Sequence, residues 1–363
     1  MKILLVITKA EIGGAQTSIL TLARGFKKCG NEIYVAFGDG DFLPIELKKE
    51  GIPFFCLKNL KRNKNPLSAI LFIFELKSLI DKERFDVIHF NSTNTLPGVF
   101  SAILSRGNPK TIFTVHGLSI LDSKYKASPF LRFLYKIYFK LFLNYIDRII
   151  FVSKCNLAEA IKQKITTRGI FISNGLDIKP DYFLSRNEAR NRLGELINND
   201  LTDDYLIGSI GRLAFPKNYE FILNIWPEIK KIKKEAKLII IGEGNERKKY
   251  EKIIKDFNIG NDVFLVGEIK NASRFLKALD LFVLPSIYEG LSISLIEVLF
   301  SGIPVLASDV GGNREVIGAE NCFTLNGEME FLEKLKKEVL VKTDKSSFTA
   351  DYMVKEYIKI YEI

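Results

Sequence analysis

Residues 281–307 constrain this chain most, because their pattern predicts a strand, a turn and a helix in immediate succession. The apolar run 281–284 stops at a proline, which predicts a short buried strand. Gly290 then provides a bend, and apolar residues at helical spacing follow until Ser301 and a glycine end the pattern. The backbone amides of residues 291–294 would point out of the helix N-terminus, a position that favours an anion.

Two carboxylates lie on this stretch, Glu289 before the helix and Glu297 within it. Glu297 would lie about two turns along the helix, far enough to hold a different part of the same ligand. The alternative interpretation is a pair of solvated glutamates on a surface helix.

The rest of the chain alternates apolar runs with helical patterns, which predicts an α/β protein with buried parallel strands. With 363 residues the chain is long enough for two domains. We expect a first domain over residues 1–177, a connection over 178–204 with a short helix near 188–196, and a second domain over 205–347. Strands are predicted at 3–7, 32–37, 53–57, 86–90, 111–115, 149–152, 169–172, 205–210, 237–241, 263–266, 281–284 and 304–307.

The positive charge of the chain is concentrated in its first half. Residues 1–177 carry 26 Lys and Arg against 14 Asp and Glu, whereas residues 178–363 carry 27 against 29. An anionic partner is therefore expected for the first half: nucleic acid, an acidic acceptor or an anionic membrane. A basic and aromatic nucleic-acid recognition module is not visible, which favours the other two.

Several loops that follow predicted strands carry residues suited to phosphate. Gly13 and Gly14 lie between the first strand and the first helix, the place where doubly wound sheets hold phosphates, but they do not form a dinucleotide fingerprint. Arg212 and Lys217 follow the strand at 205–210, where a guanidinium fork and a mobile ammonium could bracket a diphosphate.

Two basic segments of the first half have two interpretations each. A loop after the third strand is either a solvated charge run or an acceptor-binding loop; its cations are Lys58, Lys61, Arg62 and Lys64. Residues 128–148 form a strongly apolar helical pattern in which Arg132, Lys136 and Lys140 recur every four residues. That helix either packs on the sheet with its cations snorkelling outward or lies on an anionic membrane.

The two histidines differ in their predicted settings. His89 lies inside a buried strand, whereas His116 ends a strand and precedes a glycine, so its imidazole should reach a binding site. The Asp39-Gly-Asp41 sequence has the letters of a metal-binding motif, but its position after a strand favours a polar turn. Four scattered cysteines indicate a reducing compartment and no structural zinc. The N-terminal apolar run is too short for a signal peptide, and we expect a cytoplasmic protein.

Taken together, these motifs resemble those of family 4 of the retaining, nucleotide-sugar-dependent glycosyltransferases. The resemblance covers Gly13-Gly14, His116, residues 174–177, Arg212 with Lys217, and the Glu289–Glu297 stretch. It implies the GT-B fold, two facing Rossmann-like domains with an interdomain cleft, and a last helix, about 348–363, that crosses back to the first domain. It also implies sugar transfer with retention of the anomeric configuration, without a metal or other cofactor.

The resemblance also implies roles for single residues. Arg212 and Lys217 would stabilise the departing diphosphate, Glu297 would take the ribose hydroxyls, and Glu289 with His116 would contact the donor sugar. The remaining donor-binding positions implied are Gly13, Gly14, Gly267, Gly290, Leu291, Ser292 and Ile293. Ser292 departs from the family pattern, in which proline or a second glycine is common.

The expected partners are therefore a nucleotide sugar and an anionic or lipid-linked saccharide acceptor, with a possible attachment to the inner face of the cell membrane. Two other functions remain open from the sequence: a nucleotide-sugar epimerase of the same fold, and a non-catalytic membrane-surface partner of a glycan-assembly complex.

Overall fold

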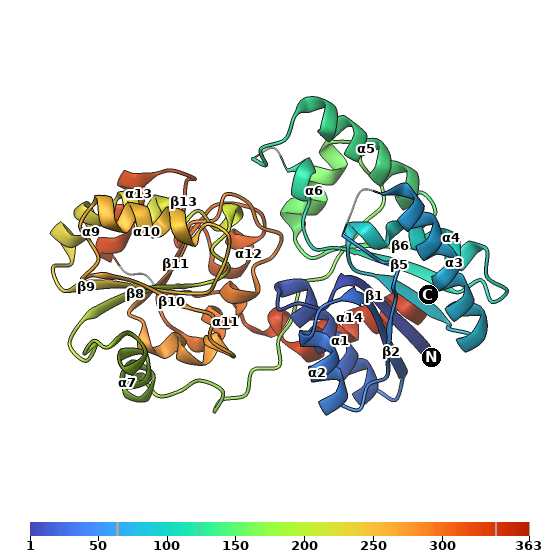
Figure 1. The fold of residues 1–363 in the computed structure, drawn as a ribbon, viewed down its shortest axis with the longest axis horizontal. Helices are drawn as coiled ribbons and strands as arrows, with labels where there is room; N and C mark the ends of the chain where they lie inside the picture. The colour runs from blue at the N-terminus through green and yellow to red at the C-terminus, as the bar shows by residue number, and fades with distance from the viewer. Residues whose placement is uncertain (63–64, 123, 338–339, 363) are drawn as a thin grey trace. The chain divides into compact units, whose positions relative to one another are not determined.

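A computed structural model describes residues 1–62, 65–122, 124–337 and 340–362, and it divides into two compact units. Unit 1 comprises Met1–Asp177 and Ser346–Ile363, and unit 2 comprises Ile178–Lys345. Each unit contains one parallel sheet between helices (Figure 1). The predicted α/β class is confirmed.

The sheet of unit 1 has seven strands in the order β3-β2-β1-β4-β5-β6-β7. Its inner strand β1 is buried from the second residue to the second-last, as the unbroken apolar run predicts. The strands are β1 (Lys2–Lys9), β2 (Glu32–Asp39), β3 (Phe54–Cys56), β4 (Val87–Phe90), β5 (Lys110–Val115), β6 (Arg148–Phe151) and β7 (Ile170–Phe171).

Alternate residues of these strands face two separate hydrophobic clusters, so each face of the sheet has its own helix layer. One face is covered by α1 (Gly14–Lys28), α2 (Phe42–Lys49) and α14 (Ala350–Glu362). The other face is covered by α3 (Pro66–Glu83), α4 (Val99–Ile103), α5 (Pro129–Leu143) and α6 (Lys154–Lys162). A 3-10 turn, η1 (Thr93–Gly98), leads into α4.

The last helix, α14, belongs to unit 1, as the expected return to the first domain requires. It packs along α1, and the two tyrosines of its last turns reach the strands beneath. Tyr361 Oη lies 2.6 Å from His89 Nδ1, and Tyr357 Oη lies 3.0 Å from Thr114 Oγ1. His89 also bonds Thr114 and is fully buried, which confirms it as a packed strand residue.

The sheet of unit 2 has six strands in the order β10-β9-β8-β11-β12-β13. The strands are β8 (Tyr205–Ile210), β9 (Ala236–Ile241), β10 (Val263–Gly267), β11 (Leu281–Leu284), β12 (Val305–Ser308) and β13 (Cys322–Phe323). The helices are α7 (Arg186–Ile197), α8 (Tyr219–Asn224), α9 (Trp226–Ile232), α10 (Arg247–Asp256), α11 (Ile293–Ser301), α12 (Asn313–Ile317) and α13 (Glu328–Lys337).

The polar stretch 178–204 forms part of unit 2. Its helix α7 is fixed by Arg190, a buried side chain that donates to the carbonyls of Ala278 and Leu201 and pairs with Asp280 at 2.7 Å. The stretch that we expected to be a polar connection is therefore part of unit 2 and contains a helix anchored to it.

In both sheets the strand order reverses beside the first strand of the unit, between β1 and β4 and between β8 and β11. Loops that leave the carboxyl ends of such strands surround the usual ligand position of an open α/β sheet. Among the residues described, no helix is long and apolar enough to cross a bilayer.

Candidate active site

An ion pair joins the loops that leave β8 and β11 in unit 2. The Lys217 ammonium lies 2.7 Å from Glu289 Oε1, and Ser286 Oγ donates to the same oxygen at 2.7 Å. Lys217 lies in a 3-10 turn after β8, η3 (Phe215–Lys217), and Glu289 follows β11. Their side chains are 20% and 15% exposed, so solvent screens the pair only partly. The structure thus brings together two residues that the sequence placed in different motifs.

Glycines allow these loops to pack backbone against backbone. A Cβ at Gly311, where φ is +53°, would lie 2.1 Å from the Glu289 carbonyl oxygen. The Gly312 amide donates to the Gly290 carbonyl at 2.7 Å, so the glycine turn after β12 holds the Glu289–Gly290 loop. A Cβ at Gly242 would likewise lie 2.1 Å from the Gly211 carbonyl oxygen. Arg212 is exposed beside this contact, and Gly267, with φ +90°, ends β10.

The helix after this loop, α11, begins at Ile293 with Ser292 in the N-cap position. The Ser292 hydroxyl lies 2.9 Å from the Ser294 hydroxyl, and both Ser292 and Leu291 are buried. The expected helix N-terminus at 291–294 is therefore present.

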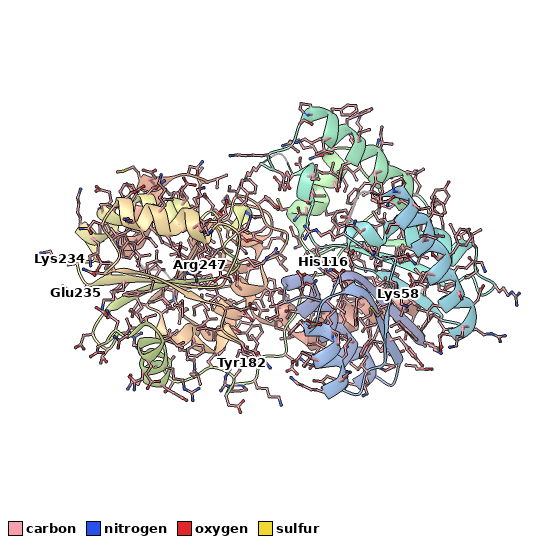
Figure 2. All side chains as sticks on the ribbon, in the orientation of Figure 1. Lys58, His116, Tyr182, Lys234, Glu235 and Arg247 are labelled. Atoms are coloured by element: carbon pink, nitrogen blue, oxygen red, sulfur yellow. The ribbon has the colours of Figure 1, made fainter. Side chains whose placement is uncertain are left out.

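Glu297 is half-buried on α11 and has neighbours that sequence motifs did not indicate. Burial raises the pKa of its carboxyl to about 7, and a hydrogen bond with Ser273 opposes that rise. Ser273 belongs to the 3-10 segment η4 (Ala272–Ala278), and its hydroxyl lies 2.7 Å from Tyr182 Oη. Tyr182 is marked on unit 2 in Figure 2.

In unit 1, His116 follows β5, and its Nε2 lies 3.3 Å from Asn91 Oδ1 at the end of the neighbouring strand β4. Asn91 Nδ2 donates to the His89 carbonyl, so Asn91 turns its oxygen toward His116. Nε2 therefore carries the proton of the neutral ring and Nδ1 its lone pair. Burial lowers the pKa of His116 to about 4, so the ring is neutral near pH 7. Figure 2 labels His116.

Apart from the cations of α5, the remaining predicted residues of unit 1 lie in three places. Gly13 and Gly14 form the start of α1, next to the end of β1. Lys58 (Figure 2), Lys61 and Arg62 are exposed on the loop after β3, whereas Lys64 lies outside the described residues. Asp39 ends β2, and Asp41 precedes α2.

Helix α5 is much less embedded than a core helix. Only Phe139 and Leu143 are buried in it, and five of its large apolar side chains are exposed by 45–70%. Arg132 donates to the Tyr125 carbonyl, Lys136 is half-buried and Lys140 is exposed.

Comparison with known proteins agrees with this architecture. A family model described as Glycosyltransferase Family 4 matches residues 12–179, and one described as Glycosyl transferases group 1 matches residues 197–340. The O-antigen biosynthesis glycosyltransferase WbnH of Escherichia coli is 27% identical over 333 residues, 92% of this chain and 88% of that protein. UDP-Gal:alpha-D-GlcNAc-diphosphoundecaprenol alpha-1,3-galactosyltransferase, also of Escherichia coli, is 26% identical over 81% of this chain and 73% of its own length.

Solved structures show the same fold at low identity. Sucrose-phosphate synthase of Thermosynechococcus elongatus superimposes with a TM-score of 0.83 at 18% identity, over 99% of this chain and 98% of that one. Anabaena HepE, solved with UDP-glucose, gives 0.76 at 17% identity, over 99% and 95%. The fold is therefore GT-B. Because the two family models follow one another along most of the chain, in the order of its two sheets, the chain belongs to glycosyltransferase family 4 and is a glycosyltransferase.

Proposed function

We propose that this enzyme transfers a hexosyl group from a nucleoside-diphosphate sugar to a hydroxyl of a lipid-linked or otherwise anionic saccharide, with retention at the anomeric carbon. The observation that carries the proposal is the ion pair of Lys217 with Glu289 at the carboxyl ends of β8 and β11. An ammonium beside a carboxylate supports the proposal, because the ammonium suits the diphosphate of a donor and the carboxylate can accept from the hydroxyls of its sugar.

In the proposed reaction the bond from the anomeric carbon to the diphosphate oxygen breaks while the acceptor oxygen bonds to the same face of that carbon. The acceptor proton passes to the leaving diphosphate. Lys217 and Arg212 stabilise the negative charge that develops on the diphosphate, a contribution that is commonly large in such transfers. Glu289 accepts from the sugar hydroxyls, Glu297 from the ribose hydroxyls, and the neutral His116 accepts from a sugar hydroxyl through Nδ1. We propose no metal ion, since two cationic side chains are available for the diphosphate.

The proposed acceptor follows from charge and from relatives. Unit 1 contains the half of the chain with a large cationic excess, which suits an acceptor that carries phosphate or diphosphate. The name of one E. coli relative specifies a diphosphoundecaprenol-linked acceptor. Such an acceptor would be reached at the inner face of the cell membrane, where we propose the enzyme works.

Calorimetric titration with UDP and with GDP, in the presence of EDTA, tests the donor site. We expect saturable binding of one nucleotide and at least about a tenfold loss of affinity in Lys217→Ala, since a charged contact contributes about 1.5–3 kcal/mol. Lys234→Ala, an exposed lysine of the same unit, should bind as the wild type does. Wild-type transfer by Lys217→Ala, or binding only after a divalent ion is restored, would contradict the proposal.

A further inference from the structure

Two helices on the same face of unit 1 turn apolar side chains to solvent on the side opposite their buried side. In α5 the buried residues are Phe139 and Leu143. A row of exposed apolar residues recurs at spacings of four, three and four: Phe130, Leu134, Ile137 and Leu141. At 3.6 residues per turn these two sets lie on opposite sides of the helix. A helix that only covers a sheet would carry polar residues there.

Helix α3 repeats the arrangement. Its buried residues are Phe72, Leu76 and Ile80, and its exposed apolar residues Leu67, Leu71 and Phe74 lie on the opposite side. Ile70 is exposed next to them. The exposed fractions reach 58% at Leu67 and 59% at Phe74, so these side chains extend well into solvent.

The two helices belong to one layer. The buried residues of α3, α4 and α5 pack into the same hydrophobic cluster on one face of the sheet. Phe100 of α4 contacts Phe142 of α5 edge-on and Tyr145 just after α5 at a tilt, with ring centroids 5.7 and 5.2 Å apart. Because all three helices bury their inner sides against the same sheet face, both exposed apolar rows point away from that face. We call the exposed apolar residues of α3 and α5 the outer layer surface.

Charge indicates what covers this surface. Helix α5 contains three basic residues and no acidic one, and Lys140 is exposed beside the apolar row. The adjacent loop after β3 brings exposed Lys61 and Arg62. Burial raises the pKa of the Tyr135 hydroxyl on α5, and the positive charge of nearby Arg62 opposes that rise. Apolar rows bordered by cations match a bilayer surface, whose acyl chains lie just beneath anionic headgroups.

We infer that the outer layer surface of α3 and α5 is a docking site for an anionic lipid bilayer, with the apolar rows inserted at the headgroup level and Lys61, Arg62, Lys136 and Lys140 on lipid phosphates. The surface lies in unit 1, for which the proposed function predicts the acceptor. The benefit of docking for sugar transfer therefore rests on the proposed function, whereas bilayer binding by this surface does not. Docking would hold the enzyme where a lipid-linked acceptor is found.

Co-sedimentation of the full chain with phosphatidylcholine vesicles, with and without phosphatidylglycerol, tests the inference. We expect binding to the anionic vesicles that salt weakens. Ile137→Ser/Leu141→Ser should lower the partition coefficient by about tenfold or more, since it removes inserted apolar groups. Ile45→Ser is the matched control, because Ile45 is 51% exposed on α2 over the other face of the sheet.

Lys136→Gln/Lys140→Gln should lower binding to the anionic vesicles by roughly fivefold per lysine and leave the weak binding to neutral vesicles unchanged. Lys48→Gln/Lys49→Gln on α2 is the charge-matched control. Calorimetric nucleotide binding, measured on each variant, reports whether that variant is folded. If the wild type binds vesicles but no nucleotide, only the proposed donor site is contradicted, and the docking surface is not.

Three outcomes would overturn the inference: equal binding to neutral and anionic vesicles, equal losses in the α2 controls, or a wild-type dimer in sedimentation equilibrium that Ile137→Ser/Leu141→Ser separates. The last result would assign the surface to a second copy of the chain.

Discussion

The Tyr182 hydroxyl lies 2.7 Å from the Ser273 hydroxyl, although 91 residues separate them in the chain. The Arg274 guanidinium donates to the Tyr182 carbonyl, and the Leu184 amide donates to the Arg274 carbonyl. The first segment of unit 2 is thereby fixed to η4, whose Ser273 bonds the Glu297 carboxyl. The environment of the proposed ribose-binding carboxylate thus depends on residues that no motif contains.

The affinity for the nucleotide should rise with pH through about 7. The pKa of Glu297 is raised to about 7 from an ordinary value of 4.5, so the carboxyl is largely protonated at pH 6 and ionised at pH 8. The ionised form is the stronger acceptor for two ribose hydroxyls. Calorimetry from pH 6 to pH 8 should show that nucleotide affinity increases a few-fold in the wild type and stays constant in Glu297→Gln. The same increase in Glu297→Gln would contradict the proposed role of Glu297 at the ribose.

Stability should change with pH in the opposite direction. A carboxyl whose pKa is higher in the folded protein than in the unfolded chain stabilises the fold fully below about 4.5, and this contribution is lost as the pH rises through about 7. The free energy of unfolding of Glu297→Gln should therefore vary less over this range than that of the wild type. Denaturant titrations at several pH values measure the difference.

Ser273→Ala should move the pH midpoint of nucleotide binding upward. The Ser273 hydrogen bond favours the ionised carboxylate, so its removal leaves burial to raise the pKa of Glu297 further. Tyr182→Phe keeps the serine and should move the midpoint less. A merely structural role of Ser273 would weaken binding equally at all pH values, and that result would refute its effect on Glu297.

The sequence predicted the strands and the order of the motifs well, because buried parallel strands are continuous apolar runs bounded by glycine or proline. The position of Glu289 after β11 and of Lys217 after β8 followed from such runs, but their ion pair did not, since it depends on the adjacency of β8 and β11. Ser286 and Asn91 had no motif signal, because single polar residues after strands are common, and Ser273 is a single serine in a 3-10 segment. The apolar pattern of α5 was visible, but which side of the helix is buried depends on where Phe139 meets the sheet.

Glu289→Gln should separate nucleotide binding from transfer. Glutamine keeps the shape but neither the charge that pairs with Lys217 nor the full acceptor capacity for sugar hydroxyls. We expect affinity for the free nucleotide to stay within a few-fold or to increase, because Lys217 is no longer attracted to a carboxylate. The rate of transfer should fall by tenfold or more, roughly the effect of one charged hydrogen bond. If nucleotide affinity falls as much as the transfer rate does, Glu289 acts only by positioning Lys217.

His116→Gln should reduce transfer and leave binding of the nucleotide unchanged. The neutral ring donates from Nε2 to Asn91 and so presents the Nδ1 lone pair, which glutamine cannot reproduce at the same place. We expect kcat/KM to fall about three- to tenfold, as for one neutral hydrogen bond. Because the pKa of His116 is about 4, the pH profiles of the two enzymes between pH 6 and pH 8 should be parallel.

Tyr361→Phe should destabilise unit 1 through His89. The Tyr361 hydroxyl is the partner of His89 Nδ1 at 2.6 Å, and both side chains are almost fully buried. Its loss leaves a polar ring nitrogen without that partner in an apolar setting, which costs about 1–3 kcal/mol in the free energy of unfolding. Tyr352→Phe changes a tyrosine of the same helix that is 41% exposed, and it should have little effect. If denaturant unfolding shows equal stability for both variants, then α14 is held by its apolar contacts with α1 rather than by the buried hydrogen bond.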